Sequence, residues 1–136
     1  MKLLHHVIAY KVDLSQLCGD VLLAFVNAFT NELVYAITAP KFREHEGKTV
    51  IIRKALYGLC TSAERWHSHF ADTLWSLGFK QTRFDNDVWI RLNIDKDVYD
   101  YLYTHVDNFM ICAKDAKLIM DHIEKVYTIK DIGPPN

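Results

Sequence analysis

The stretch YLYTHVDNFMICAKD, residues 101–115, decides the fold that this 136-residue sequence predicts. Apolar and β-branched residues flank a polar centre, so Tyr99–His105 and Phe109–Ala113 are expected to be the two strands of a hairpin. A further strand is expected upstream at Val88–Leu92, with a polar turn after it. Short strands connected by hairpins indicate an antiparallel sheet.

Two amphipathic segments predict helices, one before and one after these strands. The first covers about Ser62–Leu77, with Gly78 at the position of a C-terminal cap. The second covers about Asp115–Tyr127, with Asp115 as the N-cap. The faces expected to be buried consist of Ala63, Trp66, Phe70, Leu74 and Leu77 in the first helix, and of Ala116, Ile119, Met120, Ile123 and Tyr127 in the second. Two helices interleaved with short strands predict an α+β fold rather than an alternating parallel sheet.

The remaining segments predict more strands. Residues 3–17 have apolar positions at helical spacing and are expected to form a helix that leads into a strand ending near Asp20, followed by a turn or short helix. Leu33–Thr38 and Thr49–Lys54 are rich in β-branched residues and predict a hairpin with a long polar loop. Residues 129–136 predict a short strand that ends at a Gly-Pro-Pro sequence.

Composition limits the class of protein. With half of its residues apolar, the chain is long enough for one compact domain with a core. A net charge of -1 disfavours an autonomous nucleic-acid binder, which needs a basic surface. The cysteines, Cys18, Cys60 and Cys112, are widely spaced and odd in number, so neither a disulfide framework nor a zinc site is expected. No signal peptide or membrane-length apolar stretch is found, which favours an intracellular location, cytoplasmic or nuclear.

Three segments in order carry a resemblance to a known family. They are GDVLLAFVNAFTNELVY (residues 19–35), KALYGLCTSAERWHSHF (54–70) and YLYTHVDNFMICAKD (101–115), and the closing YTIKDIGPP (127–135) adds to them. Together they resemble the reverse transcriptases of copia-type retrotransposons, from about Gly19 to Pro135. The LYGL sequence followed by a tryptophan-bearing helix is the most specific part of the match.

The resemblance implies both a fold and an activity. The implied fold is a ferredoxin-like polymerase palm, an antiparallel sheet backed by two helices, with residues 1–136 as a single palm-like domain whose fingers are incomplete and whose thumb is absent. The implied activity is that of an RNA-directed DNA polymerase, a nucleotidyltransferase within a retrotransposon polyprotein. Its partners would be an RNA or DNA template-primer and deoxynucleoside triphosphates.

The resemblance also implies a metal site. Asp20 and Asp107 match the carboxylates that hold two Mg²⁺ ions for phosphoryl transfer in active members, and with Asn108 they are the candidate catalytic residues. The family has a second acid where this chain has Asn108, so one of three negative charges is missing and metal binding is expected to be weak or absent. Without the resemblance, both aspartates also suit turns or caps, and Asn108 also suits a turn.

Three further residues match nucleotide-binding segments of the family. Phe25 corresponds to the aromatic residue that stacks under the sugar and excludes a ribose 2′-hydroxyl, although a core position would explain it equally well. Tyr57 and Gly58 match the segment beside the incoming nucleotide, where a glycine lets the backbone approach a ligand closely. Ser62 is expected to cap the helix that follows.

Two alternatives to an active enzyme stay open. The chain could be a folded, non-catalytic remnant of such a domain, or a module adopted for nucleic-acid or protein interaction. Because of Asn108 and the truncated match, this chain by itself is expected to be inactive. Exposed sheet edges would also permit self-association.

Overall fold

The computed structural model describes residues 13–135. The helix expected within residues 3–17 lies largely outside the described residues, and Ser15 onward is strand. The chain divides into two compact units, one made of Leu23–Phe70 and the other of the segments on either side of it. Among the described residues, no helix is both long and apolar enough to cross a membrane. All three cysteines are free thiols.

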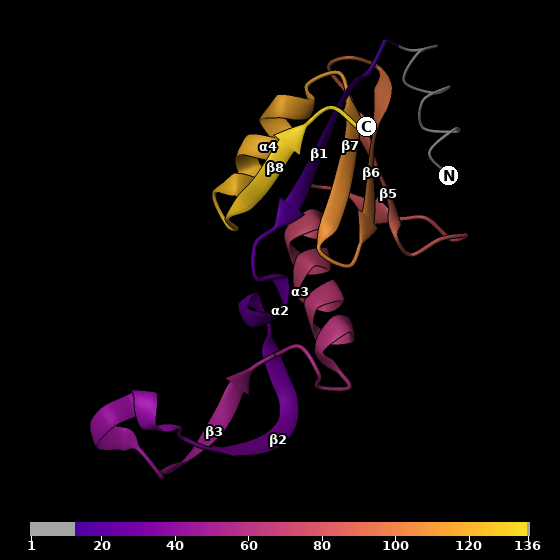
Figure 1. Cartoon of the computed structure of the whole chain (residues 1–136). Helices are drawn as coiled ribbons and strands as arrows, with labels where there is room; N and C mark the ends of the chain where they lie inside the picture. The colour runs from indigo at the N-terminus through magenta and orange to yellow at the C-terminus, as the bar shows by residue number, and fades with distance from the viewer. Residues whose placement is uncertain (1–12, 136) are drawn as a thin grey trace. The chain divides into compact units, whose positions relative to one another are not determined.

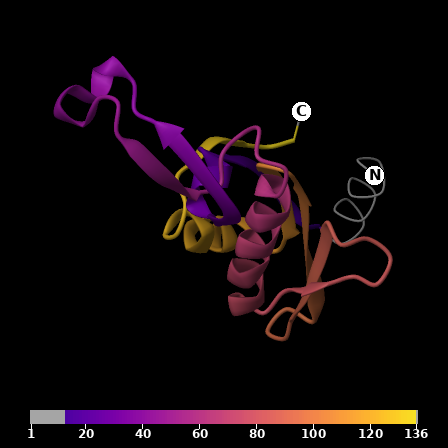
Figure 2. The same cartoon turned by 90° about the horizontal axis from the view of Figure 1, so that it is seen from below.

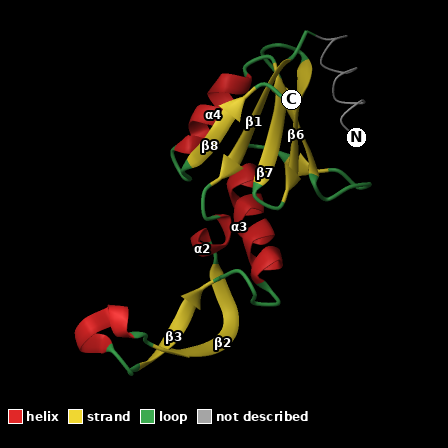
Figure 3. Ribbon diagram, in the orientation of Figure 1, coloured by secondary structure: helices red, strands yellow, loops and turns green. Residues whose placement is uncertain are grey.

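The unit formed by the flanking segments is built on one antiparallel sheet in the order β4-β5-β6-β7-β1-β8 (Figures 1 and 3). Its strands are β1 (Ser15–Val21), β4 (Lys80–Gln81), β5 (Val88–Asn93), β6 (Val98–His105), β7 (Asn108–Ala113) and β8 (Ile129–Gly133). The predicted strands of this region are confirmed, whereas the short β4 was not predicted. The strand that contains Asp20, β1, lies in the sheet between β7 and β8.

Helix α4 (Ala116–Glu124) packs across β1 and β7 and supplies much of the core of this unit (Figure 2). The residues predicted to face inward on α4 are all buried: Ala116, Ile119, Met120, Ile123 and the adjoining Tyr127. The strands contribute Trp89, Leu102, Phe109 and Ile111 to the buried residues. The Tyr127 hydroxyl also lies 2.7 Å from the Thr73 hydroxyl, which joins the end of α4 to a residue of α3 (Ser62–Ser76).

The N-terminus of α4 is capped by a residue from another element. Asp115 occupies the N-cap position as predicted, but its side chain makes no capping hydrogen bond. The Ala116 N–H instead donates to the Ser15 hydroxyl at 3.4 Å, and that hydroxyl donates to the Ala113 carbonyl at 2.8 Å. The start of β1 therefore holds the start of α4 in place.

The unit formed by Leu23–Phe70 contains α2 (Ala24–Asn27), the hairpin of β2 (Phe29–Ile37) and β3 (Thr49–Lys54), and the first part of α3. A 3₁₀ helix, Pro40–His45, occupies the loop of the hairpin. The predicted long-looped hairpin and the helix after it are confirmed. On α3, Trp66, Phe70 and Leu74 are buried as predicted, and Leu77 beyond its end is half-buried. The prediction for Ala63 is wrong, because Ser62 is the buried residue of that turn and Ala63 is exposed.

Antiparallel sheets together with packed helices confirm the α+β class. The single-domain assignment stays a prediction.

Candidate active site

The sheet brings two of the predicted catalytic residues into register. Asp20 on β1 is paired with Asn108 on β7, and the Val21 N–H donates to the Asp107 carbonyl at 2.8 Å. Residues directly opposite on antiparallel strands point to the same face of the sheet, so the Asp20 and Asn108 side chains share a face. Asp107 precedes Asn108 in the turn of the β6–β7 hairpin. The ends of two strands that are far apart in sequence therefore converge at these residues.

The turn that presents Asp107 is tight. His105 pairs with Asn108, so only Val106 and Asp107 connect β6 to β7. Val106 has a φ of 55°, a conformation that a β-branched residue rarely adopts. Such a residue costs on the order of 1–3 kcal/mol and persists only where its surroundings hold it. Here the paired strands on both sides hold it.

Gly19 allows the neighbouring strands to approach β1 closely beside Asp20. A Cβ atom at this position would lie 2.7 Å from Ile129 Cγ2 and 2.9 Å from Phe109 Cζ. Both distances are well inside van der Waals contact, so only glycine leaves room for these side chains. No local pattern in the sequence indicates a role for Gly19, because the need for a glycine comes from side chains of β7 and β8 rather than from its own segment.

Each of the two carboxylates already has a partner within the protein. The Asn108 side-chain amide donates to Asp107 Oδ1 at 3.0 Å. The Lys130 ammonium on β8 lies 3.8 Å from Asp20 Oδ2. Lys130 is a residue of this site that the sequence analysis missed, since nothing in the local pattern of β8 shows which residue will face β1.

These residues do not fit a pair of divalent cations. Mg²⁺ needs hard, preferably anionic, oxygen ligands, and two ions together carry four positive charges. Asp20 and Asp107 offer two negative charges, and Lys130 offsets one of them. Within residues 13–135, no group of three or more His, Cys, Asp or Glu side chains is placed to hold a metal ion. The donor set agrees with the expectation that Asn108 weakens the site, and metal binding itself stays untested.

The predicted nucleotide-binding residues lie in the other unit. The rings of Phe25 and Tyr57 pack with their centroids 4.4 Å apart. Phe25 is buried, whereas Tyr57 is 67% exposed. The position of Phe25 therefore suits a packing residue, and its role as a guard of the sugar stays a prediction.

Tyr57 and Gly58 form the centre of a turn. The Leu59 N–H donates to the Leu56 carbonyl at 3.2 Å, and Gly58 has a φ of 97°. Ser62, predicted as a helix cap, instead holds this turn: its hydroxyl accepts from the Leu56 N–H at 3.1 Å and donates to the Leu56 carbonyl at 2.6 Å. The LYGL segment is thus a turn fastened by the buried Ser62 to the start of α3.

Replacing Gly58 with alanine is expected to lower the free energy of unfolding by about 1 kcal/mol, because alanine resists a positive φ. The space around the position is open, so backbone strain would be the cause of the loss. Urea denaturation measures it. Ala63→Gly, an exposed position in the first turn of α3, controls for changes in the unfolded chain. An unchanged midpoint for Gly58→Ala would contradict the strain.

Glu32 ties β2 to the residue before α3. Its carboxylate accepts from the Thr61 hydroxyl at 2.6 Å and from the Thr61 N–H at 2.9 Å. These two hydrogen bonds, the hydroxyl first, hold the pKa of Glu32 below its usual value of 4.5.

A depressed pKa means that the carboxylate stabilises the fold above its unfolded pKa and that this contribution is lost as the pH falls through the lower, folded value. Thr61→Val removes the hydroxyl bond and is expected to raise the pKa of Glu32, as followed by NMR titration of its carboxyl carbon. Thr73→Val, which leaves Glu32 untouched, is the control. An unchanged Glu32 pKa in Thr61→Val would show that the hydroxyl is not the cause.

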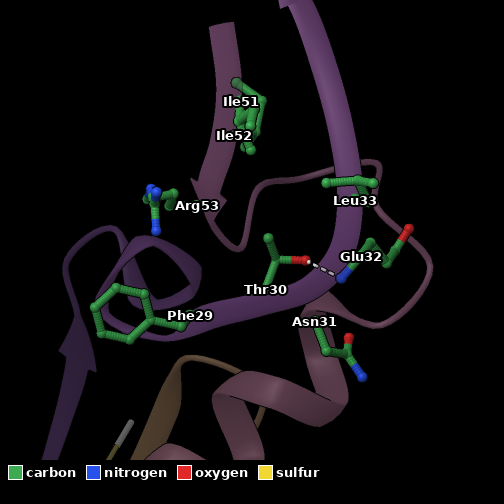
Figure 4. A pocket seen from close by; sticks show the side chains of 8 residues that line it. All are labelled: Phe29, Thr30, Asn31, Glu32, Leu33, Ile51, Ile52 and Arg53. Carbon is green, nitrogen blue, oxygen red and sulfur yellow. Dashed lines mark hydrogen bonds between the residues drawn. The ribbon is translucent and has the colours of Figure 1, made fainter.

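A pocket lies in the β2–β3 hairpin and does not coincide with the predicted site (Figure 4). The register shifts between Phe29 and Val34, which opens a space of about 330 Å³. It is lined by Phe29, Thr30, Asn31, Glu32, Leu33, Ile51, Ile52 and Arg53.

The apolar side chains of Leu33 and Ile37 are largely exposed. Self-association stays a prediction, which size-exclusion chromatography at high concentration tests.

Comparison with known proteins gives the family of this chain. The profile of the family described as reverse transcriptase (RNA-dependent DNA polymerase) matches residues 2–135. The chain therefore belongs to the reverse transcriptase family. A curated relative, the retrovirus-related Pol polyprotein from transposon RE1 of Arabidopsis thaliana, is 26% identical over an alignment of 117 residues, and the match covers 82% of this chain. The chain spans only 8% of the length of that polyprotein.

These matches confirm the resemblance to copia-type retrotransposon reverse transcriptases. No solved structure matches the chain.

Proposed function

We propose that this chain is the carboxylate-bearing palm of an RNA-directed DNA polymerase domain in a copia-type polyprotein, in a form that does not add nucleotides. One observation carries the proposal. Asp20 and Asn108 are paired across β1 and β7, so the residue that lacks a charge sits where the two strand ends converge. The convergence of the two strand ends supports the descent of this site from that of an RNA-directed DNA polymerase. The amide of Asn108, in place of a carboxylate, supports the loss of activity.

The order of elements supports a ferredoxin-like palm. If the segment from α2 to β3 and the strands β4 and β5 are set aside, the elements follow as β1, α3, β6, β7, α4 and β8, which is a β-α-β-β-α-β succession. The four strands of that succession are neighbours in the antiparallel sheet, in the order β6-β7-β1-β8. The strands β4 and β5 extend the sheet beyond β6.

The proposed partners are a template-primer and a deoxynucleoside triphosphate. Residues 23–70 contain six Lys or Arg and four Asp or Glu, so this unit has a positive balance although the whole chain does not. A positive surface favours contact with phosphates. Within the same unit Tyr57 exposes its ring, and Gly58 leaves open space beside the turn. We therefore assign the nucleotide contacts to Tyr57 and Gly58, with Phe25 packed against the Tyr57 ring.

Primer extension tests the loss of activity. With an RNA template, a DNA primer and either Mg²⁺ or Mn²⁺, the unmodified chain is expected to add no nucleotide. Metal-dependent extension by the unmodified chain would refute the proposal.

Mn²⁺ titration tests the ancestry of the site. Asn108→Asp is expected to bind Mn²⁺ saturably, as followed by calorimetry, because it restores a third carboxylate beside Asp20 and Asp107. Asp20→Asn in the same background is expected to abolish that binding. If the charge at position 108 makes no difference, the three residues do not form one site.

A further inference from the structure

The sheet places a lysine opposite Asp20 by means of a bulge. Cys18 on β1 faces Gly133, whereas Asp20 faces Lys130. Two residues along β1 thus correspond to three along β8, so β8 contains one extra residue. Asp131, at this irregularity, has a φ of 54°. An extra residue with a positive φ is characteristic of a β-bulge, which re-aims the side chains next to it.

The bulge decides the sign of the charge that faces Asp20. If the same sequence paired without a bulge, the register set by Cys18 and Gly133 would bring Asp131 opposite Asp20. Two carboxylates would then lie side by side, as they must to share a cation. With the bulge, the Lys130 ammonium lies 3.8 Å from Asp20 Oδ2 and on the same face of the sheet. Asp20 therefore has Asn108 on one side and Lys130 on the other.

We infer that Lys130 is a built-in counter-cation of Asp20, which occupies the electrostatic position of a metal ion and competes with divalent cations for this carboxylate. The inference rests on the proposed function, because it takes Asp20 as a metal-facing carboxylate. It assigns to Lys130 a role distinct from the missing charge at Asn108. Lys130 acts through Asp20 and is a positioning residue.

The exposure of the Lys130 side chain makes its competition with a divalent cation measurable. The Lys130 side chain is 51% exposed, so the ion pair contributes little to folding and the side chain can be replaced without unfolding the chain. A cation that binds at Asp20 must nevertheless displace the ammonium or tolerate its charge. Two unit charges about 4 Å apart in water change an equilibrium constant by about fivefold, and a divalent ion experiences at least that repulsion.

Mn²⁺ titration in the Asn108→Asp background tests the inference, because that variant supplies a measurable site. Adding Lys130→Gln is expected to tighten Mn²⁺ binding by at least about fivefold. Lys130→Arg keeps the charge and is expected to bind Mn²⁺ as Asn108→Asp alone does. The matched control is Lys80→Gln, which makes the same charge change on β4 at the opposite edge of the sheet. Circular dichroism melts report that each variant is folded.

The outcomes separate this inference from the proposed function. Tighter binding with Lys130→Gln and not with Lys80→Gln supports it. Equal binding in those two variants overturns it and leaves the proposed function standing. If no variant in the Asn108→Asp background binds Mn²⁺, the carboxylates do not share a site, and both the inference and the proposed function fail.

Discussion

Replacing Arg91 with methionine is expected to lower the free energy of unfolding by about 3–5 kcal/mol, the largest effect of any single change considered for this chain. The Asp100 side chain on β6 is only 1% exposed. Its Oδ2 accepts from Arg91 Nη2 at 2.7 Å and from Arg91 Nε at 3.2 Å. Methionine fills a similar volume but leaves the carboxylate buried without a cation, which is more costly than never burying the pair.

Arg91 also makes contacts that methionine cannot replace. Its Nη1 donates to the Leu77 carbonyl, just past the end of α3, at 2.9 Å. Its guanidinium lies over the Phe79 ring, 4.7 Å from the centroid. Asp100 Oδ1 has no hydrogen-bond partner among the described residues, so Arg91 is the main compensation for this buried charge. The ion pair therefore also fastens the end of α3 to the sheet.

Urea denaturation measures the effect, and a double variant gives the control. Arg91→Met with Asp100→Leu removes both charges and is expected to recover much of the lost stability. Arg91→Lys keeps the charge but lacks the planar guanidinium that donates two hydrogen bonds to Asp100. An intermediate loss of stability is therefore expected. A loss below about 1 kcal/mol for Arg91→Met would mean that the pair behaves as an exposed one.

Gly19→Ala is expected to have the second largest effect, a loss of about 1–3 kcal/mol from overpacking. The new methyl group would meet Ile129 at 2.7 Å and Phe109 at 2.9 Å. Phe109 and Ile129 belong to strands on opposite sides of β1, and the Phe109 ring is buried in the core, so it cannot turn away without disturbing its neighbours.

Gly133→Ala is the matched control for Gly19→Ala. It makes the same chemical change on β8, where no atom lies within 4 Å of the new methyl group. The control is expected to unfold at nearly the same urea concentration as the unmodified chain. Equal midpoints for the two variants would show that the sheet accommodates a side chain at position 19.

The helices and most strands were predictable because their patterns are local. The 3.6-residue period of α4 identified every buried position from Ala116 to Tyr127. On α3 the same period succeeded at Trp66, Phe70 and Leu74 and failed at Ala63. It failed there because the burial of Ser62 follows from its two bonds to Leu56, which a hydrophobic period does not describe.

Residues whose partners lie on another element could not be predicted. Ser15, rather than Asp115, accepts the first N–H of α4, because the start of β1 adjoins the end of β7. The need for glycine at position 19 and the position of Lys130 both depend on strand register. Register between strands distant in sequence is set by the assembled sheet, and a shift of one residue turns each side chain to the other face.

For the candidate site, the family resemblance contributed what local patterns could not. It singled out Asp20, Asp107 and Asn108, and the structure places Asp20 and Asn108 in register. The matching segment 127–135 contains Lys130, but the resemblance did not indicate that this residue lies beside Asp20, because the pairing of β8 with β1 includes the bulge.

The bulge in β8 has a consequence for how this sequence can change over generations. Deleting one residue between Lys130 and Gly133 would remove the mismatch with β1 and would keep Lys130 opposite Asp20 and Gly133 opposite Cys18. Inserting one residue in the same segment, with Gly133 still opposite Cys18 and the bulge unchanged in size, would instead move Lys130 one position past Asp20. A comparison of sequences that considers only substitutions at the aspartates would miss such an insertion, because the charge beside Asp20 can change with the length of β8 alone.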